Sequence, residues 1–425
     1  MKAEQFFNRL ADILSRQEWN PKALRDRLRT LLPAGHADLA DPISLQLCHR
    51  LKVPVAPQRD RIAEALNDIP ECETPLKFAL KHDCLPALEV SPAAFLPAHA
   101  FAASDLPPIV STDDLAFSLG LTPAELTRFA DPLGLSNRTD NAFAPHYLFH
   151  TLPKRDGRLR LIEEPKPLLK RIQRRLLHGL LDKVPPSPHA YGFLPGRNCA
   201  QAASRHCGEA LVVSFDLRSF FPSITAPRVF GLFRTLGYPK DVARLLTGLC
   251  TLRTPPHIRQ QLGRNADPRY AKRHLPQGAP TSPALANLCA FGLDRRLAGL
   301  ARHLDATYTR YADDLTFSGD ADIGPPLLHA VPQIVRDEGF ALTPAKTRLS
   351  RAHQQQRVTG IVVNRHLNLP RRDFDRLKAE IHQLPRDASA NRLHRLMGRI
   401  AWVEALNPRK AERLRRYLDK RLSRP

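Results

Sequence analysis

Several features that mark other protein classes are missing from this sequence of 425 residues. Its seven cysteines form no Cys-x-x-Cys pair and no regular spacing, which argues against a zinc site and favours reduced, mostly buried thiols. It contains no run of about 18 apolar residues, and its first residues lack an apolar signal core. It has no internal repeat and no low-complexity tract. We therefore expect a cytoplasmic protein of about two to four domains with no membrane partner.

Acidic residues are also scarce. The 42 Asp and Glu stand against 64 Lys and Arg, which gives a net charge of +22 and a pI near 10.2. Such an excess indicates a polyanionic partner, either nucleic acid or a membrane surface, and the lack of membrane signals favours nucleic acid. Residues 1–108 carry a net charge of −1, whereas residues 365–425 alone carry +10. The surface that binds the polyanion is therefore expected outside the first 108 residues.

The first 108 residues are predicted to form a mainly helical accessory region. Apolar residues recur there at helical spacing, at Phe6, Leu10, Ile13 and Leu14. A stretch rich in Pro and Ala, residues 91–108, predicts a linker. A helix is then expected to begin at Ser111, with Leu115, Leu119 and Leu126 facing the core.

The rest of the chain alternates strands and helices. Residues 147–153 and 159–162 predict two strands joined around Asp156-Gly157, and a helix with a basic face is expected over 168–181. Further strands are predicted at 211–216, 307–311, 315–318 and 358–364. From residue 371 onward the pattern indicates two or three amphipathic helices, which could equally be a solvated bundle with a basic face. The fold class expected from this order is α+β.

Three carboxylates stand at the ends of these predicted strands. Asp313 and Asp314 lie at a hairpin turn, and Asp216 ends the apolar run Leu211–Asp216. An isolated Asp-Asp pair is most often a solvated turn. If the strands are neighbours, however, the three carboxylates meet and need cations. Two Mg²⁺ ions about 4 Å apart would suit such a cluster, activating an attacking hydroxyl and stabilising a leaving pyrophosphate.

Further segments accompany these carboxylates in a fixed order. They are Lys154-Arg155-Asp156-Gly157-Arg158-Leu159-Arg160, Tyr191-Gly192-Phe193, Phe215-Asp216-Leu217-Arg218-Ser219-Phe220-Phe221-Pro222, Leu275-Pro276-Gln277-Gly278-Ala279-Pro280-Thr281-Ser282-Pro283 and Tyr308-Thr309-Arg310-Tyr311-Ala312-Asp313-Asp314. The set resembles the ordered blocks of a reverse transcriptase, and Val358-Thr359-Gly360-Ile361-Val362-Val363-Asn364 resembles the bacterial retron-type enzymes. The resemblance covers residues 111–364. It implies a right-hand polymerase with fingers (109–206), a palm with an antiparallel sheet (207–365) and a small basic helical thumb (366–425).

The resemblance also implies roles for individual residues. Asp216 and Asp313 would ligate both metal ions, Asp314 would complete the site, and the Leu217 carbonyl would face the metal of the nucleotide. Contacts to the incoming nucleotide would come from Lys154, Arg160, Phe221, Gln277 and Lys346. Contacts to RNA would come from His206, Val358, Thr359 and Gly360. Taken singly, these residues fit blander interpretations: a surface turn for Lys154 and Arg160, core packing for Phe221, and an exposed lysine for Lys346.

The function implied is a retron-type RNA-directed DNA polymerase. It would copy part of a dedicated structured RNA into single-stranded DNA from deoxynucleoside triphosphates, serving antiphage defence with an effector protein. Ala202 stands where such enzymes usually carry Asn in an element that ends at His206, so RNA recognition could differ here. Alternatives are a reverse transcriptase of another system, group II intron-like or for spacer acquisition, and an RNA-binding scaffold with a vestigial polymerase site.

Overall fold

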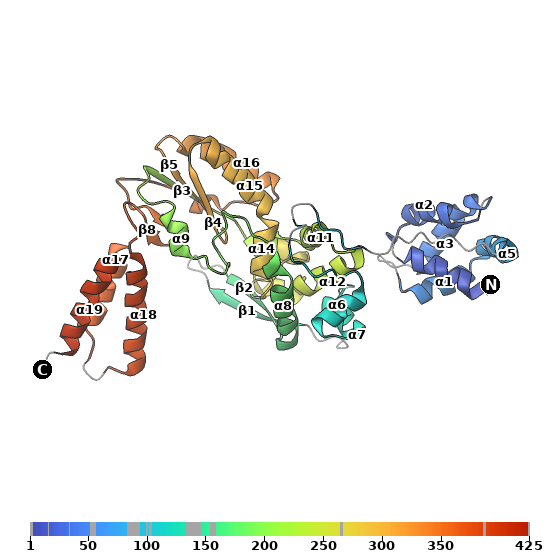
Figure 1. Cartoon of the computed structure of the whole chain (residues 1–425), viewed down its shortest axis with the longest axis horizontal. Coiled ribbons are helices and arrows are strands. Elements are labelled where there is room, and N and C mark those ends of the chain that lie inside the picture. Colours follow the sequence, from blue (N-terminus) through green and yellow to red (C-terminus); the bar gives the residue numbers. More distant parts are fainter. Residues whose placement is uncertain are drawn as a thin grey trace. The chain divides into compact units, whose positions relative to one another are not determined.

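The computed structural model describes residues 3–15, 17–33, 35–51, 57–82, 94–98, 101, 104–132, 134, 146–153, 159–263, 267–385 and 388–423. They form two compact units, Met1–Ala94 and Phe95–Pro425, called here the N-terminal unit and the main unit. Figure 1 shows the course of the chain in each. No helix among the described residues is both long and apolar enough to span a membrane.

The N-terminal unit is helical, as predicted. Its helices are α1 (Ala3–Leu14), α2 (Pro21–Leu31), α3 (Ala40–Leu51), α4 (Arg59–Asn67) and α5 (Glu73–His82), with short 3₁₀ turns η1 (Ala37–Leu39) and η2 (Pro70–Cys72). Asn20 caps α2 by accepting a hydrogen bond from the Ala23 N–H. The apolar residues predicted in α1 are buried in a core to which each of these described helices contributes. This unit therefore has a core of its own.

The main unit begins earlier in the chain than the predicted boundary at residue 108. The N–H of Leu96 donates to the Gly237 carbonyl at 3.0 Å. The ring of Phe95 lies 5.1 Å from that of Tyr238, measured between centroids. The described residues from 95 onward thus pack on the main unit, although their composition predicted a linker.

The first part of the main unit contains two short helices where a single helix was predicted to begin at Ser111. Ser111 caps α6 (Thr112–Leu119) in a capping box, as expected. Gly120 then adopts a left-handed conformation with φ of 63°, which ends α6. Thr122 caps a second helix, α7 (Pro123–Ala130), and this helix carries Leu126. The prediction that Leu126 belongs to the helix begun at Ser111 was therefore wrong, because the glycine interrupts it.

A two-stranded hairpin follows, at the place predicted for it. β1 (Tyr147–Pro153) pairs antiparallel with β2 (Leu159–Pro165). The helix α8 (Pro167–Gly179), the 3₁₀ turn η5 (Leu181–Lys183) and the helix α9 (Cys199–Ser204) come next.

The centre of the main unit is a four-stranded antiparallel sheet in the order β4-β5-β3-β6. Its strands are β3 (Leu211–Asp216), β4 (Thr307–Tyr311), β5 (Asp314–Gly319) and β6 (Arg348–Arg351). Between β3 and β4 the chain forms α10 (Phe220–Ser223), α11 (Ala226–Thr235), α12 (Lys240–Cys250), α13 (Pro256–Gln261), η6 (Pro268–Ala271), α14 (Ser282–Cys289) and α15 (Phe291–His303). Between β5 and β6 lie α16 (Gly324–Asp337) and η7 (Pro344–Lys346).

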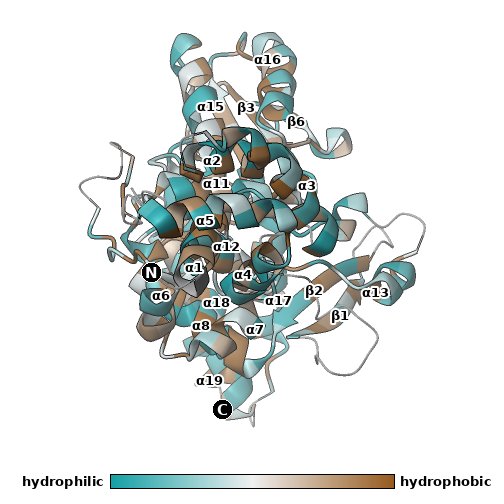
Figure 2. Cartoon of the chain, turned by 90° about the vertical axis from the view of Figure 1, so that its right-hand side faces the viewer, coloured by the Kyte–Doolittle hydropathy of each residue, from teal (hydrophilic) through white to brown (hydrophobic). Residues whose placement is uncertain are grey.

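Helices α15 and α16 lie beside the central sheet (Figure 1). Both alternate between hydrophilic and hydrophobic residues along each turn, which Figure 2 shows as alternating colours. Their apolar residues Leu293, Leu297, Leu327 and Val331 are buried in the same core as Val213, Phe215 and Phe317 of the sheet. One face of each helix therefore covers the sheet, and the α+β class predicted from the sequence is confirmed.

The chain after the central sheet differs from its prediction in one respect. Residues 358–364 were expected to form one strand, but they take part in a tight hairpin of β7 (Arg357–Val358) and β8 (Ile361–Val362). Thr359 and Gly360 have φ of 50° and 86°, so the backbone reverses there. Three helices then follow, α17 (Arg371–His382), α18 (Ala390–Leu406) and α19 (Pro408–Leu422), which pack around Leu377, Ile381, Leu396, Ile400 and Leu414.

Candidate active site

The register of the central sheet brings the three predicted carboxylates together. Asp216 ends β3 and lies directly opposite Asp314, which begins β5. Tyr311 pairs with Asp314 across the β4–β5 hairpin, so Ala312 and Asp313 form its two-residue turn. Like charges placed opposite each other destabilise a strand pair, so this arrangement has a reason other than stability.

The turn itself is held in an unusual conformation. Ala312 has a φ of 56°, in the left-handed region that costs a residue with a Cβ about 1–2 kcal/mol. The N–H of Leu217 donates to the Asp313 carbonyl at 2.9 Å. A Cβ on Gly192 would lie 2.6 Å from the Ala312 nitrogen, so only glycine lets that segment approach the turn. The strained turn is therefore fixed by close backbone packing.

A buried ion pair supports the turn from beneath. Arg310, on β4, is completely buried and makes a bidentate pair with Asp294 of α15, with both N···O distances at 2.7 Å. Its remaining nitrogen donates to Asn287 at 2.9 Å and to the Ala312 carbonyl at 3.2 Å. The hydroxyl of Tyr308 also donates to Asp294. The polar atoms of both side chains thus have hydrogen-bond partners, and the bond from Arg310 to the Ala312 carbonyl links the pair to the turn.

Neither Arg310 nor Asp294 was singled out from the sequence. The one available signal was an arginine in a strand otherwise made of Thr and Tyr, directly before the paired aspartates. Its partner lies on a helix, where an acidic residue normally indicates a solvent-facing side. The structure adds these two residues to the site as supports of the turn.

Crowding and mutual repulsion change the acidity of the turn carboxyls. Burial raises the pKa of Asp313, and the charge of Asp216 adds to that rise. The Asp314 side chain reaches solvent, yet the protein around it displaces much of its water. That desolvation, with the charges of Asp313 and Asp216, raises the pKa of Asp314 to about 6. A cation bound among these carboxyls would relieve the repulsion.

Lys346 supplies one positive charge at the site. Its Nζ lies 2.6 Å from Oδ2 of Asp216, and the N–H of Thr343 donates to the Asp216 carbonyl at 2.8 Å. In the described part of the chain, no three His, Cys, Asp or Glu side chains are arranged to surround a metal ion. The donor set nevertheless fits a divalent cation, because carboxylate oxygens are the hard ligands that such ions prefer.

The β1–β2 hairpin contributes Arg160, an exposed residue of β2. The positive charge of Arg160 lowers the pKa of Asp313, against the larger effect of burial, so the guanidinium acts on the carboxylate turn. Lys154, the other basic residue predicted on this hairpin, lies outside the described residues.

Phe221 and Gln277 lie on two further segments. Phe221 belongs to α10, and its half-buried ring lies 6.0 Å from that of Phe193 and 5.7 Å from that of Phe220. Gln277 is half-buried, and its carbonyl accepts a hydrogen bond from the N–H of Glu163 on β2 at 2.9 Å. The loop that carries Gln277 is thus joined to the strand that carries Arg160.

Of the four residues predicted to contact RNA, two are buried and two are at least partly exposed. His206 is completely buried, and its ring nitrogens lie 2.7 Å from the hydroxyls of Ser318 and Thr309. That burial lowers its pKa to about 3, so the ring is neutral. The predicted contact of His206 with RNA does not agree with the structure, because the side chain has no exposed surface. Its two ring nitrogens contact a residue of β5 and a residue of β4 instead.

Val358 is also buried, so its side chain is not available to RNA either. Thr359 is partly exposed, and its hydroxyl donates to the carbonyls of Val358 and Cys199. Gly360 is exposed, with no atom within 4 Å of the place that a Cβ would take. The tip of the β7–β8 hairpin is therefore open to a partner, while its base is packed.

Comparisons with known proteins show which family has a similar sequence. Residues 152–363 match the family model described as reverse transcriptase (RNA-dependent DNA polymerase). The retron Mx65 reverse transcriptase of Myxococcus xanthus is 43% identical over 316 residues, covering 73% of this chain and 72% of the relative. The retron Mx162 enzyme of the same organism is 38% identical, covering 72% and 66%. The retron Ec86 enzyme of Escherichia coli is 32% identical, covering 64% and 81%.

Among solved structures, a foamy viral protease–reverse transcriptase in complex with double-stranded DNA matches with a TM-score of 0.36 and 15% identity. That match covers 84% of this chain and 58% of the viral chain. The chain belongs to the bacterial retron-type reverse transcriptases and is an RNA-directed DNA polymerase.

Proposed function

We propose that this polymerase copies part of one dedicated, structured RNA into single-stranded DNA that stays associated with the protein. The observation that carries the proposal is that Asp216, Asp313 and Asp314 meet at one end of the inner strands β5 and β3, beside a turn kept in place by buried contacts. In this proposal residues 109–206 are the fingers, 207–365 the palm and 366–425 the thumb. The similarity to retron enzymes supports the choice of a dedicated RNA.

Two Mg²⁺ ions would be held by Asp216 and Asp313, with Asp314 and the Leu217 carbonyl completing the site. Such ions supply charge neutralisation for the attacking hydroxyl and the leaving pyrophosphate. The protein's own part is to present the carboxylates together, and the Arg310–Asp294 pair holds the turn that does so. Lys346 pairs with Asp216 in the structure, and it would be free to face the phosphates once cations occupy the carboxylates.

The incoming deoxynucleoside triphosphate would lie between the β1–β2 hairpin and the carboxylate turn. Arg160 acts on Asp313 from this hairpin, which supports a contact to the triphosphate, and Lys154 is proposed to share that role. Gln277, on the loop joined to β2, would contact the nucleotide or the template.

Phe221 is proposed to exclude ribonucleotides by blocking the 2′-hydroxyl. We expect Phe221→Val to raise ribonucleotide incorporation relative to deoxynucleotide incorporation about 10- to 100-fold, as the loss of a steric contact does in other pockets. Single-nucleotide extension with each substrate measures the ratio. Phe291→Val, at an exposed position in α15, is the matched control and should leave the ratio unchanged. Retained synthesis with an unaltered ratio in Phe221→Val would assign Phe221 to core packing.

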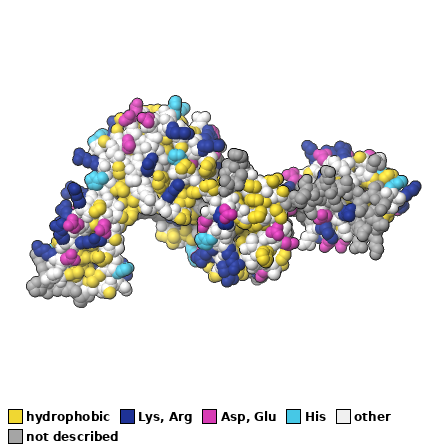
Figure 3. Space-filling model, viewed as in Figure 1, with side chains coloured by type: hydrophobic (Ala, Val, Ile, Leu, Met, Phe, Trp, Pro, Cys, Tyr) yellow, Lys and Arg dark blue, Asp and Glu magenta, His cyan; other side chains and the backbone are white. Residues whose placement is uncertain are grey.

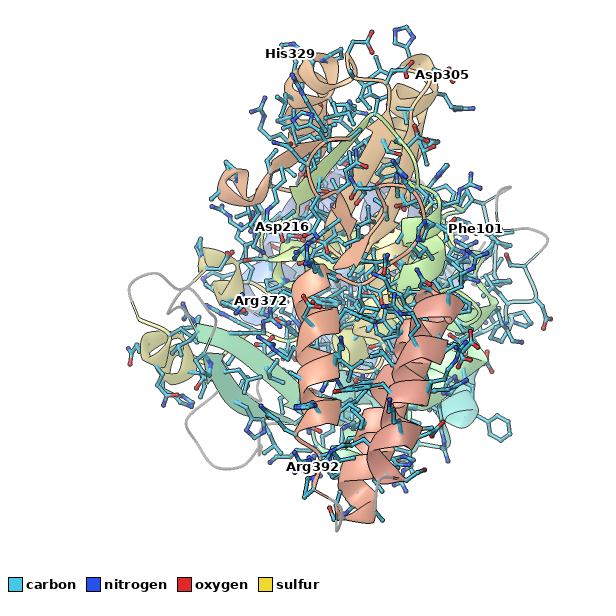
Figure 4. The ribbon with its side chains drawn as sticks, turned by 90° about the vertical axis from the view of Figure 1, so that its left-hand side faces the viewer. Phe101, Asp216, Asp305, His329, Arg372 and Arg392 are labelled. Carbon is cyan, nitrogen blue, oxygen red and sulfur yellow. The ribbon has the colours of Figure 1, made fainter. Side chains whose placement is uncertain are left out.

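The C-terminal helices are proposed to grip an RNA duplex. Lys and Arg side chains gather over α17–α19 (Figure 3), and those exposed on α17 and α18 include Arg371, Arg372, Arg376, Arg392 and Arg395. Figure 4 shows Arg372 and Arg392 on these helices. Such contacts to phosphates supply affinity without reading sequence. Selection of the cognate RNA is proposed for the exposed tip of the β7–β8 hairpin, Thr359 and Gly360.

Sequencing the nucleic acid that co-purifies with the full chain tests the proposed function. We expect one structured RNA, with single-stranded DNA complementary to part of it. Gly360→Asn adds a side chain at the exposed tip in a residue type that tolerates positive φ, and it should lower the share of that RNA. Gly263→Asn, at another exposed glycine with positive φ, is the control. A diverse RNA pool, intron RNA or spacer-derived sequence in the wild type would refute the retron assignment.

We further propose that the complex serves antiphage defence in the cytoplasm together with an effector protein. The near-neutral charge of residues 1–108 suits a contact with protein better than one with RNA. Plating of phage on cells that carry the intact locus, compared with cells whose chain is inactive, measures this role. Equal plating on both for a broad phage panel would count against it.

A further inference from the structure

A second buried polar pair lies away from the carboxylate turn, and none of the roles proposed above uses its side chains. Glu163 of β2 and His274 are both completely buried, with 3.0 Å between Oε2 of Glu163 and Nε2 of His274. The other carboxylate oxygen of Glu163 accepts a hydrogen bond from the hydroxyl of Thr254 at 2.6 Å. The ring of Tyr270 covers the imidazole edge-on, with 5.3 Å between centroids.

Both ring nitrogens of His274 have a partner. Nδ1 lies 2.8 Å from the carbonyl of Lys272, which accepts a hydrogen bond. Nε2 lies 3.0 Å from Oε2 of Glu163. These two contacts hold the imidazole in one orientation, and the second joins it to β2. A buried polar pair of this kind contributes little net stability, because desolvation offsets most of the attraction, so a role in positioning is more consistent with it.

Glu163 and His274 lie where β2, which carries Arg160, meets the loop that carries Gln277. Glu163 follows Arg160 on β2, and its N–H donates to the Gln277 carbonyl at 2.9 Å. A Cβ on Gly278 would lie 3.1 Å from the Glu163 carbonyl, so the loop and the strand touch closely. His274 lies three residues before Gln277 in the same loop. The contact between Glu163 and His274 and the backbone hydrogen bond thus clamp one loop to one strand.

We propose that Glu163 and His274 are positioning residues, which set Arg160 relative to Gln277 so that both meet one incoming nucleotide. The inference rests on the nucleotide roles proposed above. Neither side chain reaches the substrate, so loss of the clamp should weaken nucleotide binding more than it slows chemistry. A rise in KM with kcat nearly unchanged is the kinetic sign of lost binding that the substrate and the transition state share.

The test compares His274→Ala with Glu163→Gln in single-nucleotide extension. His274→Ala should raise the KM for deoxynucleotide about tenfold and change kcat less than about threefold. Glu163→Gln should keep KM within about twofold of wild type. Its amide oxygen can accept from Thr254 and its amide N–H can donate to Nε2 of His274, so both contacts survive without a carboxyl group. Should His274→Ala fail to fold, Thr254→Val removes one bond of the cluster and should raise KM by a smaller factor.

Hydrogen exchange provides a readout that does not depend on activity. His274→Ala should speed exchange in β2 and in residues 274–278 together. Thr247→Val is the matched control, because the Thr247 hydroxyl donates to the Ala243 carbonyl within α12. It should speed exchange in α12 alone and leave KM unchanged.

Arg160→Ala separates failure of the inference from failure of the nucleotide role. If Arg160→Ala raises KM but a folded His274→Ala does not, the positioning role is overturned. If Arg160→Ala leaves KM unchanged, the proposed contact of Arg160 is refuted, and the exchange data alone decide whether the pair joins the two segments. Exchange in β2 that stays at the wild-type rate in His274→Ala overturns the clamp.

Discussion

Replacing Asp313 by Asn is expected to lower DNA synthesis about 1,000-fold or more. Asn has the size of Asp and keeps the turn, but it removes one charge from the proposed metal ligands. Loss of several kcal/mol of transition-state stabilisation corresponds to a rate change of this order. Primer extension on a generic RNA template with Mg²⁺ measures it. Affinity for RNA should change less than about twofold, because the contacts to phosphates are proposed to come from the basic surface and not from the turn.

Asp305→Asn is the matched control for this substitution. Asp305 is exposed, precedes β4 at the end away from the turn, and has a φ of 48° that Asn tolerates (Figure 4). It should leave synthesis unchanged. Synthesis by Asp313→Asn within about tenfold of wild type would contradict the metal assignment, since a ligand in a two-metal site contributes more than that.

Replacing Asp294 by Asn is expected to give the largest loss of stability. It leaves the Arg310 guanidinium buried without a charged partner, which typically costs about 3–5 kcal/mol. Urea denaturation measures the free energy of unfolding. Asp337→Asn breaks the exposed pair with Arg296 and should cost less than about 1 kcal/mol, which makes it the control.

The double variant Asp294→Leu with Arg310→Met separates stability from the placement of the turn. An apolar pair of similar volume should recover most of the lost stability. It cannot donate to the Ala312 carbonyl, so synthesis should stay well below wild type. A double variant with both stability and synthesis near wild type would show that the buried pair does not position the carboxylate turn.

Local patterns predicted much of the fold because they depend on neighbouring residues. The hairpin of β1 and β2, the apolar strand ending at Asp216 and the turn at Asp313 all follow from short-range alternation and turn chemistry. Errors arose where a backbone conformation interrupted a pattern. Gly120 ended one helix, and Thr359 with Gly360 reversed a predicted strand.

Side-chain burial at the site was less predictable. His206 was expected to touch RNA, yet its hydrogen-bond partners on β4 and β5 lie more than a hundred residues away in the sequence. Glu163 and His274 are 111 residues apart, and each resembles an ordinary surface residue in its local sequence. Periodicity cannot reveal such pairs, because they form only when distant segments pack.

The sequence by itself determined the charge, the order of the motifs, the strand ends that carry Asp216, Asp313 and Asp314, and hence the family. The tertiary structure alone decided the antiparallel register that sets Asp216 opposite Asp314, and the partners of Arg310 and His274. The physical reason is burial. A charged group removed from water must find its partner wherever the fold places one, and that place is independent of distance along the chain.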